Sequence, residues 1–162
     1  MAQVVIADAS PIVILSQIGG LDWLAAFFGQ VWLTQVVRDE VLPEGDKPGV
    51  EAIRAAIDAG ILVVLDRDWS SPVFPELDEG EASSIRAALN LPDKCLLLMD
   101  ERLGRVYAQE NGLQVVGVVG LVGMARLRGL IPSAAAVFER LLQTDFRISP
   151  DIIRGVLRKV GE

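Results

Sequence analysis

The chain has 162 residues and is 51% hydrophobic, which suits one compact domain with its own core and argues against disorder. Its net charge is −7 and it contains no histidine, which excludes serine–histidine and cysteine–histidine catalysis and histidine-ligated zinc. An acidic chain is also unlike a general nucleic-acid coat protein, so its carboxylates form either a solvated surface or a cation site.

The predicted elements alternate between short apolar strands and helices. The first strand covers 4–7, and a helical region then runs from Ser10, as N-cap, and Pro11 to 28, with a break at 19–20. The later predicted strands are 31–33, 61–65, 96–99 and 115–119, and the later helices are 35–42, 50–59, 79–90, 103–111, 121–128, 134–142 and 150–160. This alternation predicts an α/β fold with a parallel sheet, in a single domain covering 1–162.

The sequence also indicates where the protein resides. It has no basic region ahead of an apolar run at its start, and no window of about 18 apolar residues is free of charge. Cys95 is the single cysteine, and its apolar neighbours predict a buried, inert thiol, which fits a reducing compartment. We therefore expect a cytoplasmic protein with no membrane span.

Two aspartates follow apolar strands directly. Asp8 comes after the strand 4–7, and Asp100 comes after the strand 96–99. Ligands of an open parallel sheet bind beyond the carboxyl ends of the strands, so both aspartates are candidates for one site. The alternative for either one alone is an ordinary turn or cap residue.

Two glutamates share the apolar stripe of a predicted helix. Glu40 is spaced to project with Val36 and Val37, and Glu81 is spaced to project with Ile85. A buried carboxylate is costly without a cation or donors, so a shared cation would explain both. The alternatives are a Glu40 that reaches solvent from the edge of the stripe and a Glu81 that closes a capping box with Asp78.

Four converging carboxylates without histidine suit a hard divalent cation such as Mg²⁺ or Mn²⁺. Such a cation orients a phosphate and activates water, which predicts phosphodiester hydrolysis. Arg102 and Arg105 could contact the phosphate, although a helix-surface arginine is the better explanation for each one alone. The three tryptophans, at 23, 32 and 69, are scattered, and packing explains them better than base stacking.

The acidic motifs resemble those of PIN-domain nucleases, and most closely the bacterial and archaeal subfamily similar to VapC toxins. The similar segments are Asp8-Ala9-Ser10-Pro11, the stretch around Glu40, Gly80-Glu81-Ala82, Met99-Asp100-Glu101, Gly104-Arg105, 117–120, 129–132 and the C-terminal Val-Gly-Glu. Their order and spacing cover nearly the whole chain.

This resemblance implies a three-layer α/β/α sandwich with a parallel sheet of about five strands. It also implies Mg²⁺- or Mn²⁺-dependent cleavage of RNA by a toxin that an antitoxin neutralises, often as a homodimer. The metal ligands would be Asp8, Glu40, Glu81 and Asp100, and the supporting residues would be Ser10, Glu101 and Arg105. Val118 departs from the subfamily, which usually has threonine there.

Two functions of different class follow. The first is a metal-dependent endoribonuclease, which the complete set of four acids favours. The second is a catalytically weak or inactive module of the same fold that binds a protein partner or RNA, which the acidic net charge and Val118 favour. In either case we expect an apolar segment, 21–28, to be covered by a second copy or an antitoxin helix.

Overall fold

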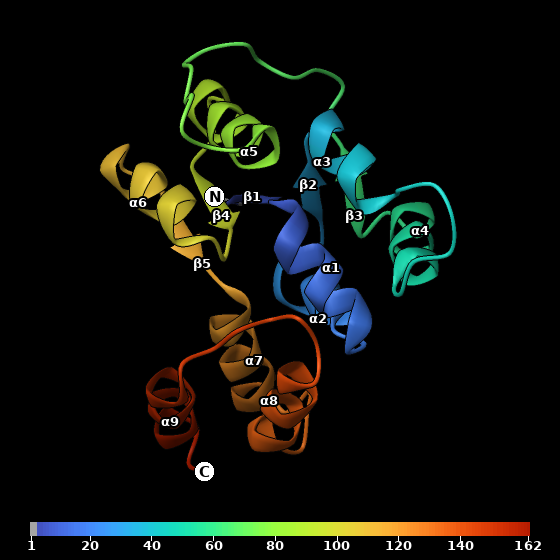
Figure 1. Cartoon of the computed structure of the whole chain (residues 1–162), viewed down its shortest axis with the longest axis vertical. Helices are drawn as coiled ribbons and strands as arrows, with labels where there is room; N and C mark the ends of the chain where they lie inside the picture. The colour runs from blue at the N-terminus through green and yellow to red at the C-terminus, as the bar shows by residue number, and fades with distance from the viewer. Residues whose placement is uncertain (1–2) are drawn as a thin grey trace. The chain divides into compact units, whose positions relative to one another are not determined.

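The computed structural model describes residues 3–162, which divide into two compact units. The first unit ends at Val116, and the second is Gly117–Glu162. The first unit contains a five-stranded sheet in the order β3-β2-β1-β4-β5, with every pair of neighbouring strands parallel (Figure 1). The strands are β1 (Val4–Ala7), β2 (Val31–Leu33), β3 (Leu62–Val64), β4 (Cys95–Leu98) and β5 (Gln114–Val116). The predicted α/β fold with a parallel sheet is confirmed.

Six helices connect or follow these strands in the first unit: α1 (Ala9–Gln17), α2 (Leu21–Phe28), α3 (Gln35–Val41), α4 (Val50–Asp58), α5 (Glu79–Asn90) and α6 (Arg102–Glu110). The chain adds β2 and then β3 on one side of β1, and afterwards returns to add β4 and β5 on the other side. Strand order therefore reverses between β1 and β4, and the carboxyl ends of these two strands border the crevice where such sheets bind ligands.

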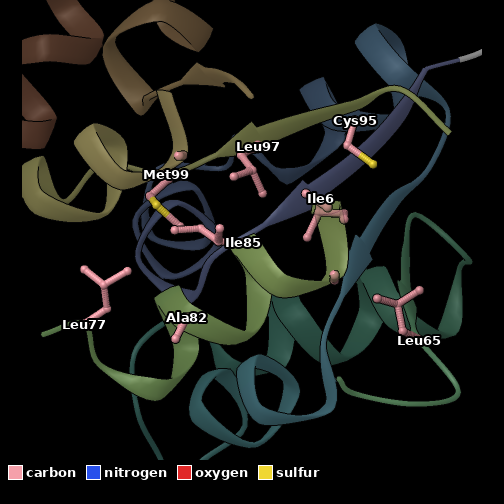
Figure 2. Packing of buried hydrophobic residues seen from close by; sticks show 11 residues of the cluster. Ile6, Leu65, Leu77, Ala82, Ile85, Cys95, Leu97 and Met99 are labelled. Atoms are coloured by element: carbon pink, nitrogen blue, oxygen red, sulfur yellow. The ribbon is translucent and has the colours of Figure 1, made fainter. Parts of the chain in front are cut away.

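One face of the sheet packs against α5. Ile6 of β1 and Leu97 of β4 lie in one buried cluster with Ala82 and Ile85 of α5, and Met99 joins it just beyond β4 (Figure 2). Side chains alternate along a strand, so the intervening residues, which are also buried, face the opposite side. Right-handed crossovers place the helices before and after the reversal on opposite faces, which gives the expected α/β/α layering.

The start of α1 differs from the prediction. Asp8, rather than Ser10, is the N-cap, and Pro11 lies in the first turn instead of beginning the helix. Proline is tolerated there because an amide in the first turn has no partner within the helix. The sequence alone did not separate these two positions, since both Asp and Ser are good cap residues.

The end of the sheet also differs. The predicted strand 115–119 stops at Val116, and α7 (Val118–Leu127) begins three residues earlier than expected, with Gly117 as its N-cap. A short apolar run fits a buried strand and a buried helix equally well, so hydrophobicity did not locate this boundary.

The apolar segment 21–28 is partly buried within the first unit, and its coverage by a partner stays a prediction. Leu21, Trp23 and Leu24 are buried in the structure, and Phe27 and Phe28 are half-buried.

Within residues 3–162, no single helix is long and apolar enough to cross a membrane, and only α1 and α2 together, bent by 116°, meet that length and composition. Cys95 is buried and free, and burial raises the pKa of its thiol to about 11, which fits an inert cysteine.

The second unit consists of α7, α8 (Ala134–Leu142) and α9 (Pro150–Lys159). Its last residue is fixed by the start of α8. The Glu162 carboxylate accepts hydrogen bonds from the Ala134 amide at 2.7 Å and the Ser133 hydroxyl at 2.9 Å, and it pairs with Arg126 at 3.2 Å. The hydrogen bond that the Ala134 amide donates is the main reason that the pKa of Glu162 is lowered.

We expect Glu162→Ala to lower the melting temperature at pH 7, because it removes an anion from the N-terminus of a helix. A lowered pKa stabilises the fold above the ordinary carboxyl pKa and ceases to do so as the pH falls through the folded value. The difference between wild type and variant should therefore shrink below about pH 4. Thermal melts at both pH values test this, with the exposed Glu139→Ala on α8 as the control, which should stay close to wild type.

Candidate functional site

The two strand-end aspartates lie on neighbouring strands. Ala7 of β1 is in register with Leu98 of β4, and the Asp8 amide donates to the Leu98 carbonyl at 2.9 Å. Asp8 is 4% exposed, and Asp100 is half-buried with its Oδ2 atom enclosed. Both carboxylates thus lie at the reversal of strand order.

Local geometry turns Asp8 toward α5. Its backbone is still extended, so its side chain continues the face of Ile6, which packs against α5. An N-cap carboxylate normally accepts from the amides of the second or third helical residue, but the third here is Pro11, which has no N–H. The Asp8 side chain makes no such capping bond, and the Ala9 amide is its backbone donor.

Glu81 lies in the first turn of α5 and is 6% exposed. The Asp78 carboxylate caps this helix by accepting from the Glu81 amide at 2.8 Å, so the cap half of the capping box is present. The Glu81 carboxylate points to α6, where a Cβ added at Gly104 would come within 3.1 Å of its Oε2. The same Cβ would come within 2.7 Å of Met99 Sδ, so Gly104 makes room for both side chains.

Glu40 corrects part of the prediction. Val37 and Val41 fill the buried stripe of α3, whereas Glu40 is exposed at the edge of that stripe. Its carboxylate nevertheless reaches α5, where a Cβ added at Gly80 would lie 2.5 Å from its Oε1. A second glycine thus makes room for a second glutamate.

A chain of buried hydrogen bonds fixes α3 against α5. The Val37 amide donates to Thr34 Oγ1 at 3.1 Å, and Thr34 Oγ1 lies 2.8 Å from Ser83 Oγ. Ser83 Oγ donates in turn to the Gly80 carbonyl at 2.9 Å, so the bond between the two hydroxyls is donated by Thr34. This chain ends at the same glycine that Glu40 contacts, and it therefore holds Glu40 and the first turn of α5 together.

The carboxylates repel one another. Burial is the main cause that raises the pKa of Asp8 to about 7, and the charges of Asp78, Glu40 and Asp100 raise it further. Burial likewise raises the pKa of Glu81 to about 8, with contributions from Asp78, Asp8 and Glu101. The pKa of Glu40 is raised by burial and by Asp78.

These mutual effects define one acidic centre made of Asp8, Glu40, Asp78, Glu81, Asp100 and Glu101. Asp78 is the member that the sequence reasoning treated only as a cap. Its Oδ1 caps α5 while its charge acts on three other members, because the first turn of α5 lies at the centre of the cluster. Its position three residues before Glu81 was visible in the sequence, but a cap explained it fully.

The supporting residues lie nearby. Arg105 is half-buried and donates from Nη1 to the Met99 carbonyl at 2.9 Å, so it holds the turn that carries Asp100. Ser10 is half-buried in the first turn of α1, and Glu101 is the exposed N-cap of α6. The described contact of Arg105 is thus to backbone, and a contact to phosphate stays a prediction.

The donor set decides which cation would fit. All the available donors are carboxylate oxygens, which suit hard divalent cations. Within residues 3–162, no three Asp, Glu, Cys or His side chains stand close enough together to hold a metal ion between them. Mg²⁺ binds through one or two carboxylates and keeps several waters, so it fits such a spread-out set better than a cation that needs a closed cage.

We expect the metal-free protein to lose stability as the pH rises from 4 to 8. A carboxyl whose folded pKa is raised favours the fold below its ordinary pKa, and this advantage disappears as the pH passes the raised value. Asp8→Asn should therefore stabilise the protein at pH 8, by about 1–4 kcal/mol for a shift of this size, and should have little effect near pH 4.

Urea unfolding in EDTA at both pH values measures this effect. Glu81→Gln should behave like Asp8→Asn, whereas the exposed Asp58→Asn on α4 should leave the pH dependence of wild type intact. If the free energy of unfolding depended on pH equally in wild type and Asp8→Asn, the pKa of Asp8 would not be raised in the folded protein.

The comparisons with known proteins identify the family of this chain. No curated protein matches the chain. Residues 4–162 match the model of the DUF3368 family, which is described as a PIN domain. This match includes all the elements that carry the acidic centre and extends through the second unit. The chain therefore belongs to the PIN domain family.

Proposed function

We propose that the protein is a Mg²⁺- or Mn²⁺-dependent endoribonuclease. The observation that carries the proposal is the acidic centre, in which buried carboxylates with raised pKa values repel one another at the reversal of strand order. A cluster of this kind needs protons or a cation, and with a divalent cation bound these carboxylates would support phosphodiester hydrolysis. PIN domains are generally nucleases, which agrees with that chemistry.

The four carboxylates would differ in how firmly they hold the cation, because they lie on elements of different rigidity. Asp8 and Asp100 have short side chains beyond the ends of paired strands, so they would hold the cation most firmly. Glu40 and Glu81 reach in from helices and would bind it directly or through water. The bound cation supplies charge stabilisation at the phosphate and an activated water. Arg105 keeps the Asp100 turn in place through the Met99 carbonyl.

The biological setting is proposed by resemblance to the VapC-like subfamily. In this proposal the enzyme is a cytoplasmic toxin, an antitoxin protein neutralises it, and it forms a homodimer. A second candidate is a catalytically inactive PIN-fold module that acts by binding a partner or RNA. The net charge of −7 and Val118 favour that candidate.

RNA cleavage with and without metal tests the proposal. Wild type should cut single-stranded RNA in Mn²⁺ or Mg²⁺ and stop in EDTA. The variants Asp8→Asn, Glu40→Gln, Glu81→Gln and Asp100→Asn should all be slower, and the two aspartate changes should be the most severe, with losses of about 100-fold or more for a metal ligand or its support.

Folding controls accompany this measurement. Mn²⁺ should raise the melting temperature of wild type by linkage and that of Asp8→Asn by less. The exposed Asp58→Asn should keep both cleavage and the metal response. Metal-independent melting of wild type together with an absence of cleavage would favour the binding module.

Gly80→Ala separates the position of Glu40 from the stability of the fold. The added methyl would lie 2.5 Å from Glu40 Oε1, which is the end of a flexible side chain and can move away. Alanine also favours a helix over glycine by about 1 kcal/mol. We expect a variant that is at least as stable as wild type but clearly slower in RNA cleavage, as measured by urea unfolding and by single-turnover rates. A fully active Gly80→Ala enzyme would show that the position of Glu40 against α5 is not needed.

A further inference from the structure

A second feature of the first unit lies beside the acidic centre. A cavity of about 470 Å³ is bordered by the N-terminal part of α3, by α5 and by the loop 65–77 between β3 and α5. Its lining includes Asp68, Trp69, Ser70, Val73, Glu79 and Arg86. This volume lies within the range of small-ligand sites. Glu79 directly follows Asp78 of the acidic centre, so the first turn of α5 borders both places.

Arg86 is a buried charge at this cavity. It is 6% exposed, and it donates from Nε to the Trp69 carbonyl at 2.7 Å and from Nη2 to Glu79. A guanidinium has five N–H groups, so three are left over. No described hydrogen bond within residues 3–162 uses these three, and no Arg86 nitrogen is enclosed without a partner, so they face the open cavity or solvent. They are available to an acceptor group that enters the cavity.

The carboxylates of the cavity are already compensated. Asp68 accepts from the amides of Gln35 and Val36, at 2.9 and 3.2 Å, at the start of α3, and Glu79 pairs with Arg86. Because each carboxylate already has a donor partner, its charge repels a nucleic-acid backbone less. Each carboxylate oxygen can still accept a further hydrogen bond from a ligand N–H group. The cavity thus combines hydrogen-bond donors with acceptors.

Trp69 adds an aromatic surface. Its ring is half-buried, it lines the cavity, and the Arg67 guanidinium lies 4.9 Å from its ring centroid. The loop that carries it is fixed, because Arg86 holds the Trp69 carbonyl and Asn90 donates to the Ser71 carbonyl at 2.8 Å. The exposed Arg67 lies over one face of the ring, so a base would stack on the part of the ring that lines the cavity, with this positive charge near its phosphate. As the sequence analysis expected, Trp69 also packs against the buried cluster that contains Ile85, and the rest of its surface borders the cavity.

We propose that this cavity binds one unpaired guanine of a single-stranded RNA. Unpaired bases are recognised by stacking on aromatic or guanidinium planes and by hydrogen bonds to their edges. Guanine presents O6 and N7 as acceptors, which arginine recognises best, and its N1–H and amino group are donors for Glu79 or Asp68. This inference rests on the proposed ribonuclease function, since it makes the cavity the subsite that selects the base near the cut.

The first experiment measures binding without cleavage. Calorimetric titration in EDTA compares GMP with AMP, CMP and UMP on the full chain. We expect GMP to bind most tightly to wild type and about tenfold or more weakly to Trp69→Ala, since stacking carries much of such affinity. Trp69→Phe should retain most of the binding. Val73→Asp should weaken it with little risk to the fold, because Val73 is 72% exposed and the change adds a negative charge at the cavity.

The matched control is Ala52→Asp, which adds the same charge at an exposed position of α4 away from this cavity and should bind GMP like wild type. The second experiment maps cuts in a randomised single-stranded RNA with Mn²⁺. Wild type should cut at a fixed distance from guanine, and Val73→Asp should cut with that preference lost.

The outcomes separate the two proposals. RNA cleavage with the same base profile in wild type, Trp69→Ala and Val73→Asp would overturn the guanine subsite and leave the nuclease intact. GMP binding that Val73→Asp weakens, in a protein that cuts no RNA, would support the subsite and count against the nuclease. Equal binding of all four nucleotides, or of none, would overturn the subsite.

Discussion

The main physical constraint on the site is the repulsion among the carboxylates that meet where strand order reverses. The rest of the fold has to hold them together against it. Asp8 and Glu81 are almost fully buried, and each has its pKa raised above the usual carboxyl range by burial and by its neighbours. Such a cluster is unfavourable for the isolated fold at neutral pH, because desolvation and like charges both oppose ionisation. The fold must therefore keep the carboxylates together by contacts that do not depend on them.

Those contacts come from the apolar and polar packing around α5. Its apolar side is fixed to β1 and β4 through the cluster around Ile85, and its first turn is tied to α3 through Thr34 and Ser83. The two glycines of the site then leave space for glutamates rather than for methyl groups. The apolar contacts and neutral hydrogen bonds of α5 thus hold the mutually repelling carboxylates in place. Functional sites are commonly held in an unfavourable arrangement by the structure around them.

Helix α5 borders both the acidic centre and the neighbouring cavity. Its first turn presents Asp78 and Glu81 to the acidic centre, while Glu79 and Arg86, seven residues apart on one side of the helix, border the neighbouring cavity. A rigid element shared by both would set the distance between a bound base and a hydrolysed phosphate. Sites on helices hold such distances more precisely than sites on loops.

The sequence by itself determined the parallel α/β class and the placement of Asp8 and Asp100 directly after strands. It also placed Glu40 and Glu81 on helices near the carboxyl edge of the sheet. These features could be predicted because strand–helix alternation and apolar periodicity are local signals. The sequence did not separate Asp8 from Ser10 as the cap of α1, nor the end of β5 from the start of α7, because those boundaries depend on which of two locally adequate residues or structures packs better. The tertiary structure alone decided that Asp78 joins the acidic centre, that Glu40 reaches it from an exposed position, and that Arg86 borders a cavity. Each of these depends on contacts between segments far apart in the chain, which no local pattern encodes.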